Sequence, residues 1–140
     1  MEFATPRLIL SVDFPDANAL LAGVLSLKGF KVLKSKSTNE CLSLVNQSDE
    51  KVDIILIDKE SAIANNSLLL NEINKIAPDI MMVVIVDNDD DIRKLPEKLV
   101  ECVLMPTTAE NLADKVLNML AKKELKRIKE SRRPEYEINF

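Results

Sequence analysis

Three aspartates directly follow apolar runs in this chain, where carboxylates from different runs could act together. Asp13 follows RLILSV, Asp58 follows VDIILI and Asp87 follows IMMVVIV. If the runs are parallel strands of one sheet, their carboxyl ends meet at one edge, and Asp13 and Asp58 converge there when their strands are neighbours. Carboxylate oxygens are the ligands that hard cations such as Mg²⁺ take. The alternative for Asp58 is an ordinary role as the cap of a helix or loop.

Residues that are absent exclude several kinds of chemistry. The chain has no histidine, which excludes a histidine base, a Ser-His-Asp or Cys-His pair and a phosphohistidine of its own. Its only glycines, Gly23 and Gly29, cannot form a glycine-rich phosphate loop. Cys41 and Cys102 are too few for a disulfide scaffold, so we expect reduced, buried thiols.

Composition indicates one soluble domain with an uneven charge distribution. The 140 residues are 46% apolar and 30% charged, enough for a buried core. No apolar run approaches the roughly 18 to 20 residues of a membrane span, and the first residues do not resemble a signal peptide, so we expect a cytoplasmic protein without membrane contact. Residues 1–121 carry 12 basic and 19 acidic side chains, whereas residues 122–140 carry 7 basic and 4 acidic ones.

The elements that would position the aspartates alternate between strands and helices. Short β-rich runs predict strands at 7–12, 30–33, 52–57, 80–86 and 102–105. Helical patterns occupy 16–28, 38–47, 67–76, 90–99 (weakened by Pro96) and a last segment that begins at a Thr107/Thr108 cap and ends at Pro134. Five β-α repeats predict an α/β fold, a doubly wound five-stranded parallel sheet with helices on both faces and an extended C-terminal helix.

Several of these segments together resemble the receiver domain of two-component response regulators, over residues 6–121. VDIILID is similar to the third strand of that family, and SVDFPD to the end of its first strand. Further segments complete the pattern: Lys28-Gly29-Phe30 followed by STNECL, the APD before an apolar strand, and Met105-Pro106. The resemblance implies a flavodoxin-like (β/α)5 sheet in the order 2-1-3-4-5, with residues 122–140 as a basic helical extension and tail.

The resemblance also implies roles for the strand-end carboxylates. Asp58 takes the place of the phosphoacceptor, a nucleophile that receives its phosphoryl group from the phosphohistidine of a partner histidine kinase. Asp13 and Asp58 would then hold Mg²⁺, with Asp16 or Glu60 as an alternative ligand.

Three positions depart from the family pattern. Val12 replaces the first acid of strand one, Val86 stands where the family has Thr or Ser, and Met105 stands where it has Lys. Because the hydroxyl donor and the cation that respond to phosphorylation are both replaced, we interpret the chain as a degenerate, pseudo-receiver-like domain.

The basic segment 122–133 has three interpretations. It is a solvated extension of the last helix, or it contacts a partner or a second copy, or its cations meet the phosphates of a nucleic acid or a membrane surface. For the partner contact, the candidate residues are Leu117, Leu120, Leu125 and Ile128.

From these residues we expect a binding module rather than an enzyme. The leading hypothesis is a stand-alone receiver-like domain that acts in a phosphorelay by protein contact, with atypical or absent switching at Asp58. The alternatives are a phosphorylation-independent homodimeric adaptor and a DNA-associated regulator that uses the basic helix. A small phosphoryl-transfer or flavin enzyme on the same fold is disfavoured by the scarcity of glycine, aromatic residues and histidine.

Overall fold

Strands and helices alternate along the described part of the chain in the computed structural model. The structure describes residues 5–11, 15–47, 51–86, 89–96, 99–104 and 108–138. In chain order the elements are β1 (Arg7–Ser11), α1 (Pro15–Leu27), β2 (Lys31–Lys34), α2 (Thr38–Gln47), β3 (Ile54–Asp58), α3 (Lys59–Ile76), β4 (Met81–Val86), α4 (Asp89–Arg93), β5 (Glu101–Leu104) and α5 (Ala109–Ile138).

The strands form one parallel sheet. Among the described residues, five strands pair in the order β2-β1-β3-β4-β5. Ser11 pairs with Ile57 between β1 and β3, and Asp58 pairs with Ile85 between β3 and β4. The expected flavodoxin-like α/β fold with a parallel sheet is confirmed. The order changes direction between β1 and β3, and such a switch point is where open parallel sheets place their ligands.

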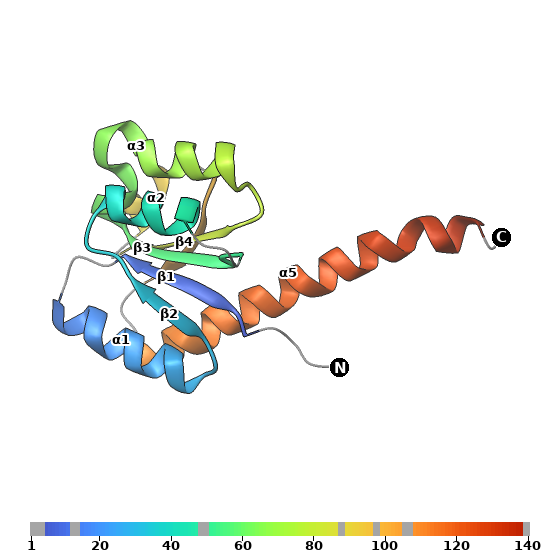
Figure 1. Ribbon diagram of the computed structural model, residues 1–140, viewed down its shortest axis with the longest axis horizontal. Coiled ribbons are helices and arrows are strands. Elements are labelled where there is room, and N and C mark those ends of the chain that lie inside the picture. The colour runs from blue at the N-terminus through green and yellow to red at the C-terminus, as the bar shows by residue number, and fades with distance from the viewer. Residues whose placement is uncertain are drawn as a thin grey trace.

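Helices cover both faces of the sheet (Figure 1), and each face has its own core of buried side chains. Alternate side chains of β1, β3 and β4 point to opposite faces, as the pleat requires. Leu10, Leu56 and Ile85 pack with α1 and α5 on one face. Ile57 and Val86 pack with α2 and α3 on the other. The continuous apolar runs of the central strands therefore result from burial on both sides.

Local signals place the helix ends that frame the site. The Ser37 hydroxyl accepts a hydrogen bond from the Glu40 N–H at 3.1 Å, which caps α2 as expected. The Thr108 hydroxyl accepts from the Asn111 N–H at 3.1 Å and caps α5 in the same way. Gly29 follows α1 with φ of +100°, a conformation that favours glycine.

Three helices differ from the sequence-based expectation. α3 begins at Lys59 rather than residue 67, because Asp58 caps an earlier turn, and left-handed residues at 65–67 interrupt it before the expected second part. α4 ends at Arg93 instead of reaching residue 99, because Pro96 cannot donate a backbone hydrogen bond. α5 continues past Pro134 to Ile138, so the proline does not end the helix. Within the described ranges, no helix is long and apolar enough to cross a membrane.

Candidate functional site

Asp58 is a buried carboxylate at the carboxyl end of β3, a central strand. Its residue is only 6% exposed, and it is one of few buried polar residues in the part of the chain that the structure describes. β3 carries it there because Ile54, Leu56 and their neighbours are buried on both faces of the sheet. The sequence-based prediction that Asp58 ends the third strand agrees with this position.

The Asp58 side chain caps α3 through Ser61. The Ser61 N–H donates to Asp58 Oδ2 at 3.2 Å, and the Ser61 hydroxyl donates to Asp58 Oδ1 at 2.7 Å. Asp58 has extended backbone angles, φ −78° and ψ 159°, as residues preceding a helix usually do. The capping role weighed as an alternative for Asp58 is thus present in the structure. It satisfies part of the carboxylate's hydrogen-bonding capacity and leaves acceptor lone pairs on both oxygens.

A nucleophilic role is chemically compatible with this capping geometry. A carboxylate oxygen can attack a phosphoryl group while the other oxygen keeps its hydrogen bond. The N-terminus of α3 carries partial positive charge, which favours negative charge on Asp58 and on a phosphoryl group attached to it. The arrangement is therefore chemically compatible with an acceptor at Asp58.

Val86 cannot assist Asp58. Its side chain is 1% exposed and packs in the core beneath α2 and α3. Val86 therefore has no hydroxyl to offer, and its side chain is enclosed by apolar neighbours.

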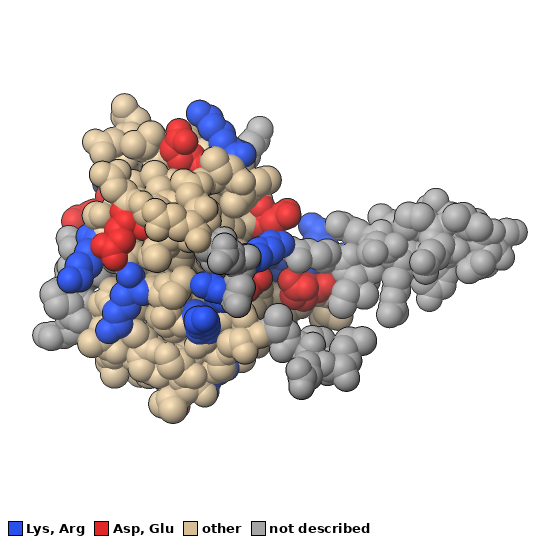
Figure 2. Space-filling model, viewed as in Figure 1, with Lys and Arg blue, Asp and Glu red and all other residues tan. Residues whose placement is uncertain are grey.

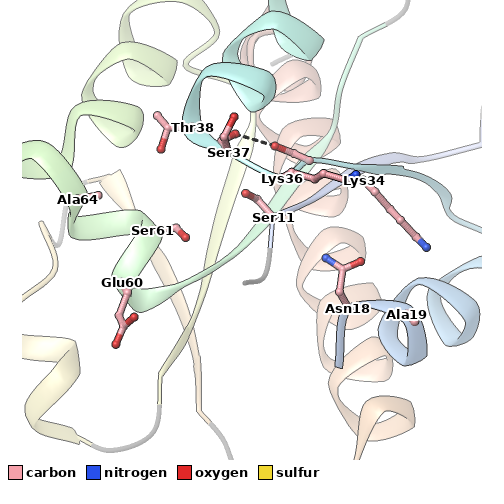
Figure 3. Close-up of a pocket in the computed structure, with 11 residues that line it drawn as sticks. Ser11, Asn18, Ala19, Lys34, Lys36, Ser37, Thr38, Glu60, Ser61 and Ala64 are labelled. Carbon is pink, nitrogen blue, oxygen red and sulfur yellow. Dashed lines mark hydrogen bonds between the residues drawn. The ribbon is translucent and has the colours of Figure 1, made fainter. Parts of the chain in front are cut away.

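The predicted Mg²⁺ ligands are only partly described. Asp13, Val12 and Met105 lie outside the described residues, as does the side chain of Asp16. Glu60 is exposed and points away from the neighbouring serines in the close-up (Figure 3). Among the described side chains, no group of three or more carboxylates and thiols could hold a metal ion. Because Asp58 is also engaged by Ser61, the described residues do not assemble a magnesium site.

The candidate partner-binding residues of α5 divide into two sets. Leu117 is 37% and Leu125 is 57% exposed. Leu120 instead packs, half-buried, against the core beneath α1 and α5, so it stabilises the fold rather than offering a free surface. The side chain of Ile128 lies outside the described residues.

The structure adds two features that the sequence reasoning missed. Ser61 holds Asp58, and its position three residues after the cap is a known capping spacing that could have been recognised. A cavity of about 600 Å³ lies beside Asp58, at the carboxyl ends of β1 and β2. Its lining residues are Ser11, Asn18, Ala19, Lys34, Ser35, Lys36, Ser37, Thr38, Glu60, Ser61 and Ala64. Short polar residues scattered over four segments give no local sequence signal.

Solved structures that superimpose on this chain include response regulators and their receiver domains. A response regulator from Thermotoga maritima superimposes with a TM-score of 0.71 at 20% identity, covering 84% of this chain and 99% of that one. A CheY-like receiver domain protein from Methanospirillum hungatei JF-1 gives 0.73 at 15% identity, with 88% and 99% covered. NtrX from Brucella abortus gives 0.73 at 24% identity, where 94% of this chain matches 30% of that longer one.

The sequence matches no protein-family model and no curated protein. At identities below 25%, the structural similarity establishes the receiver fold. The function of the site must be inferred from its own residues.

Proposed function

We propose that this chain is a receiver-like signalling module that works by protein contact, with Asp58 in the phosphoacceptor position and without the usual phosphorylation switch. The observation that carries the proposal is the Asp58 carboxylate, buried at the end of a central strand and held by Ser61 rather than by a strand-end hydroxyl and lysine. The fold supports the same assignment, because Asp58 ends the third strand of a receiver-like sheet.

The absence of a hydroxyl at residue 86 argues against the usual switch. A Thr or Ser hydroxyl at that place would move toward a phosphoryl group, whereas Val86 is an apolar residue buried in the core. Any signal from Asp58 would therefore act on its direct partner, Ser61, and on the start of α3. A module of this kind transmits information through the surface that it presents to a histidine kinase or another signalling protein.

A phosphorylation experiment tests the acceptor role. The protein is incubated with acetyl phosphate and MgCl₂, and intact masses of the wild type and Asp58→Asn are compared. In the reaction, an Asp58 oxygen bonds to phosphorus while the bond between phosphorus and the acetyl oxygen breaks, which releases acetate. One added phosphoryl group in the wild type and none in Asp58→Asn is the expected result for a functional acceptor.

A matched control separates the acceptor from other carboxylates. Asp79 is an exposed aspartate in the turn before β4, so Asp79→Asn should accept as much phosphate as the wild type. A parallel incubation with EDTA tests whether Mg²⁺, which we propose at Asp13 and Asp58, is required. If the wild type gains no mass and does not bind beryllofluoride, the acceptor role is refuted and the protein is a phosphorylation-independent adaptor.

A second candidate function, a homodimeric adaptor, is favoured by exposed leucines on neighbouring helices. α1 has no charged residue between Ala17 and Leu27, and its Leu20 and Leu27 are 60% and 88% exposed. The surface over α1, at the bottom of the space-filling view, carries few charges (Figure 2). Leu117 and Leu125 of α5 add exposed apolar area.

Light scattering across a concentration series tests the homodimer. Leu27→Glu and Leu125→Glu should each shift a dimer toward monomer, whereas Leu68→Glu, at an exposed leucine of α3, should not. A monomer at every concentration would refute this candidate.

The DNA-associated alternative predicts that the affinity for DNA falls steeply as the salt concentration rises, because contacts with phosphates release counterions.

A further inference from the structure

The cavity beside Asp58 is built from polar groups at the switch point of the sheet. It lies where β1, β2 and β3 end, between the first turns of α2 and α3 and the start of α1. Its volume of about 600 Å³ is within the usual range for small-molecule sites, roughly 300 to 1,000 Å³. Figure 3 shows Ser11, Asn18, Ser37 and Ser61, from four different segments, around this space.

Ser11 is the feature that indicates a ligand. It is only 6% exposed, and in Figure 3 its hydroxyl points into the cavity. Within the described part of the chain, no hydrogen bond of this hydroxyl is found. Its oxygen is not among the enclosed polar atoms that lack a partner, so it is open to the cavity and can donate to a ligand there. The neighbouring serines are already engaged: Ser35 Oγ donates to the Ser37 carbonyl at 2.8 Å, and Ser37 Oγ accepts from Glu40.

The positive groups of the cavity lie on the side of α2. Lys34 and Lys36 flank Ser35 in the segment that leads from β2 into α2, and both line the cavity. The ten-residue helix α2 begins at Thr38, another lining residue. Ser37 satisfies the N–H groups of Glu40 and Cys41, so the first two N–H groups of the helix remain for an acceptor. Two ammonium groups and a helix N-terminus favour an anion.

We propose that this cavity binds a small phosphate monoester, with its phosphate group between Lys36, the N-terminus of α2 and the Ser11 hydroxyl. A phosphate oxygen accepts the hydrogen bond that Ser11 lacks, and Lys34 and Lys36 neutralise the phosphate charge. The cavity is larger than a phosphate ion, so the rest of the ligand extends toward Asn18. Binding here does not require phosphorylation of Asp58, because Asp58 is not among the lining residues, although the two sites share Ser61 as a neighbour.

An NMR titration tests the proposal on the whole chain. Backbone amide shifts are followed while adenosine 5′-monophosphate, inorganic phosphate or adenosine is added. We expect saturable shifts in residues 35–39 with the two phosphates and none there with adenosine. Asp58→Asn should behave as the wild type, so this outcome does not depend on phosphorylation.

Three variants separate a built site from general attraction to lysines. Lys36→Gln should weaken the binding of adenosine 5′-monophosphate about 5- to 10-fold, since a charge-assisted contact is lost. Lys31→Gln is the matched control, because Lys31 is an exposed lysine of the nearby strand β2 and lies outside the cavity, so it should change affinity less than about 2-fold. Ser11→Ala should weaken binding and leave the thermal unfolding midpoint unchanged, because Ser11 forms no hydrogen bond with the described residues without ligand.

Several results would overturn the proposal. One is the absence of saturable shifts up to about 10 mM phosphate. The dissociation constant would then exceed about 10 mM, which is weaker than expected for a specific site of this kind. Another is equal weakening by Lys36→Gln and Lys31→Gln, which would mean a general charge effect. Shifts confined to residues near the ends of β4 and β5 would place the phosphate at the acceptor edge instead.

Discussion

Replacing Asp58 should reveal its capping role as a loss of stability that is separate from any phosphorylation. Asp58→Ala removes the side-chain acceptor of the Ser61 N–H, and loss of an N-cap costs about 1 kcal/mol. It also removes the 2.7 Å bond from the Ser61 hydroxyl, which adds about 1 kcal/mol. We therefore expect a loss of about 2 kcal/mol in the free energy of unfolding. Asp58→Asn keeps one acceptor oxygen and should lose less than about 1 kcal/mol.

Urea unfolding with a double-mutant cycle measures this contribution. Ser61→Ala retains the backbone N–H but removes the hydroxyl, so it should cost about 1 kcal/mol. The double variant Asp58→Ala/Ser61→Ala should then be more stable than the sum of the single losses predicts, by about 1 kcal/mol. Asp79→Ala serves as the control, because Asp79 is exposed and its ion pair with Lys51 is long, at 3.9 Å.

Two results would contradict this capping role: a cost of less than about 0.5 kcal/mol for Asp58→Ala, or single losses that add within about 0.3 kcal/mol. Either result would mean that Ser61 does not hold the carboxylate in solution. The stability of Asp58→Asn also serves as a control for the phosphorylation experiment. If Asp58→Asn is nearly as stable as the wild type, its failure to gain a phosphoryl group is due to the missing nucleophile and not to unfolding.

Four further substitutions have outcomes that follow from burial and backbone conformation. Val86→Thr should cost about 1 to 2 kcal/mol in urea unfolding, because it buries a hydroxyl in an apolar core, and phosphoryl incorporation should not increase. Burial raises the pKa of the Cys41 thiol from 9.0 to about 12, so the thiol ionises first in the unfolded chain. The stability that this contributes is complete below pH 9 and is lost as the pH rises toward 12; unfolding at several pH values should show a steeper decline for the wild type than for Cys41→Ala. Gly29→Ala should lower the unfolding midpoint because φ there is +100°, whereas Gly23→Ala, in a helix with open space around it, should raise the midpoint.

The sequence was sufficient to predict the fold because its central strands are buried on both faces. Ile54 to Ile57 are all fully buried, and only a sheet covered on both sides accepts such a run. The start of α2 was also predictable, because Ser37 is a local capping signal. The early start of α3 was not, because helical periodicity in residues 59–67 is too short to recognise and is broken by left-handed residues.

Of the candidate site, only the position of Asp58 was predicted, because that position depends on the end of a single strand. Asp58 could be placed because it directly follows an apolar run. The orientation of Val86 depends on the register between β3 and β4, which no local pattern specifies. The cavity depends on tertiary structure still more strongly, since Ser11, Lys36 and Ser61 come from segments that the fold alone brings together.

Asp58 caps α3 and is also the proposed phosphoacceptor, so phosphorylation of Asp58 would disturb the cap. A phosphoryl group on one carboxylate oxygen would compete for the hydrogen bonds that Ser61 now donates. Loss of these hydrogen bonds would first change the start of α3, which lies before the left-handed residues 65–67. It would not act on β4, because Val86 has no polar side-chain group. Ser61 also lines the phosphate-binding cavity that we propose. The first turn of α3 is therefore the element through which an acceptor at Asp58 and a ligand in that cavity would influence each other, because both touch the same residue.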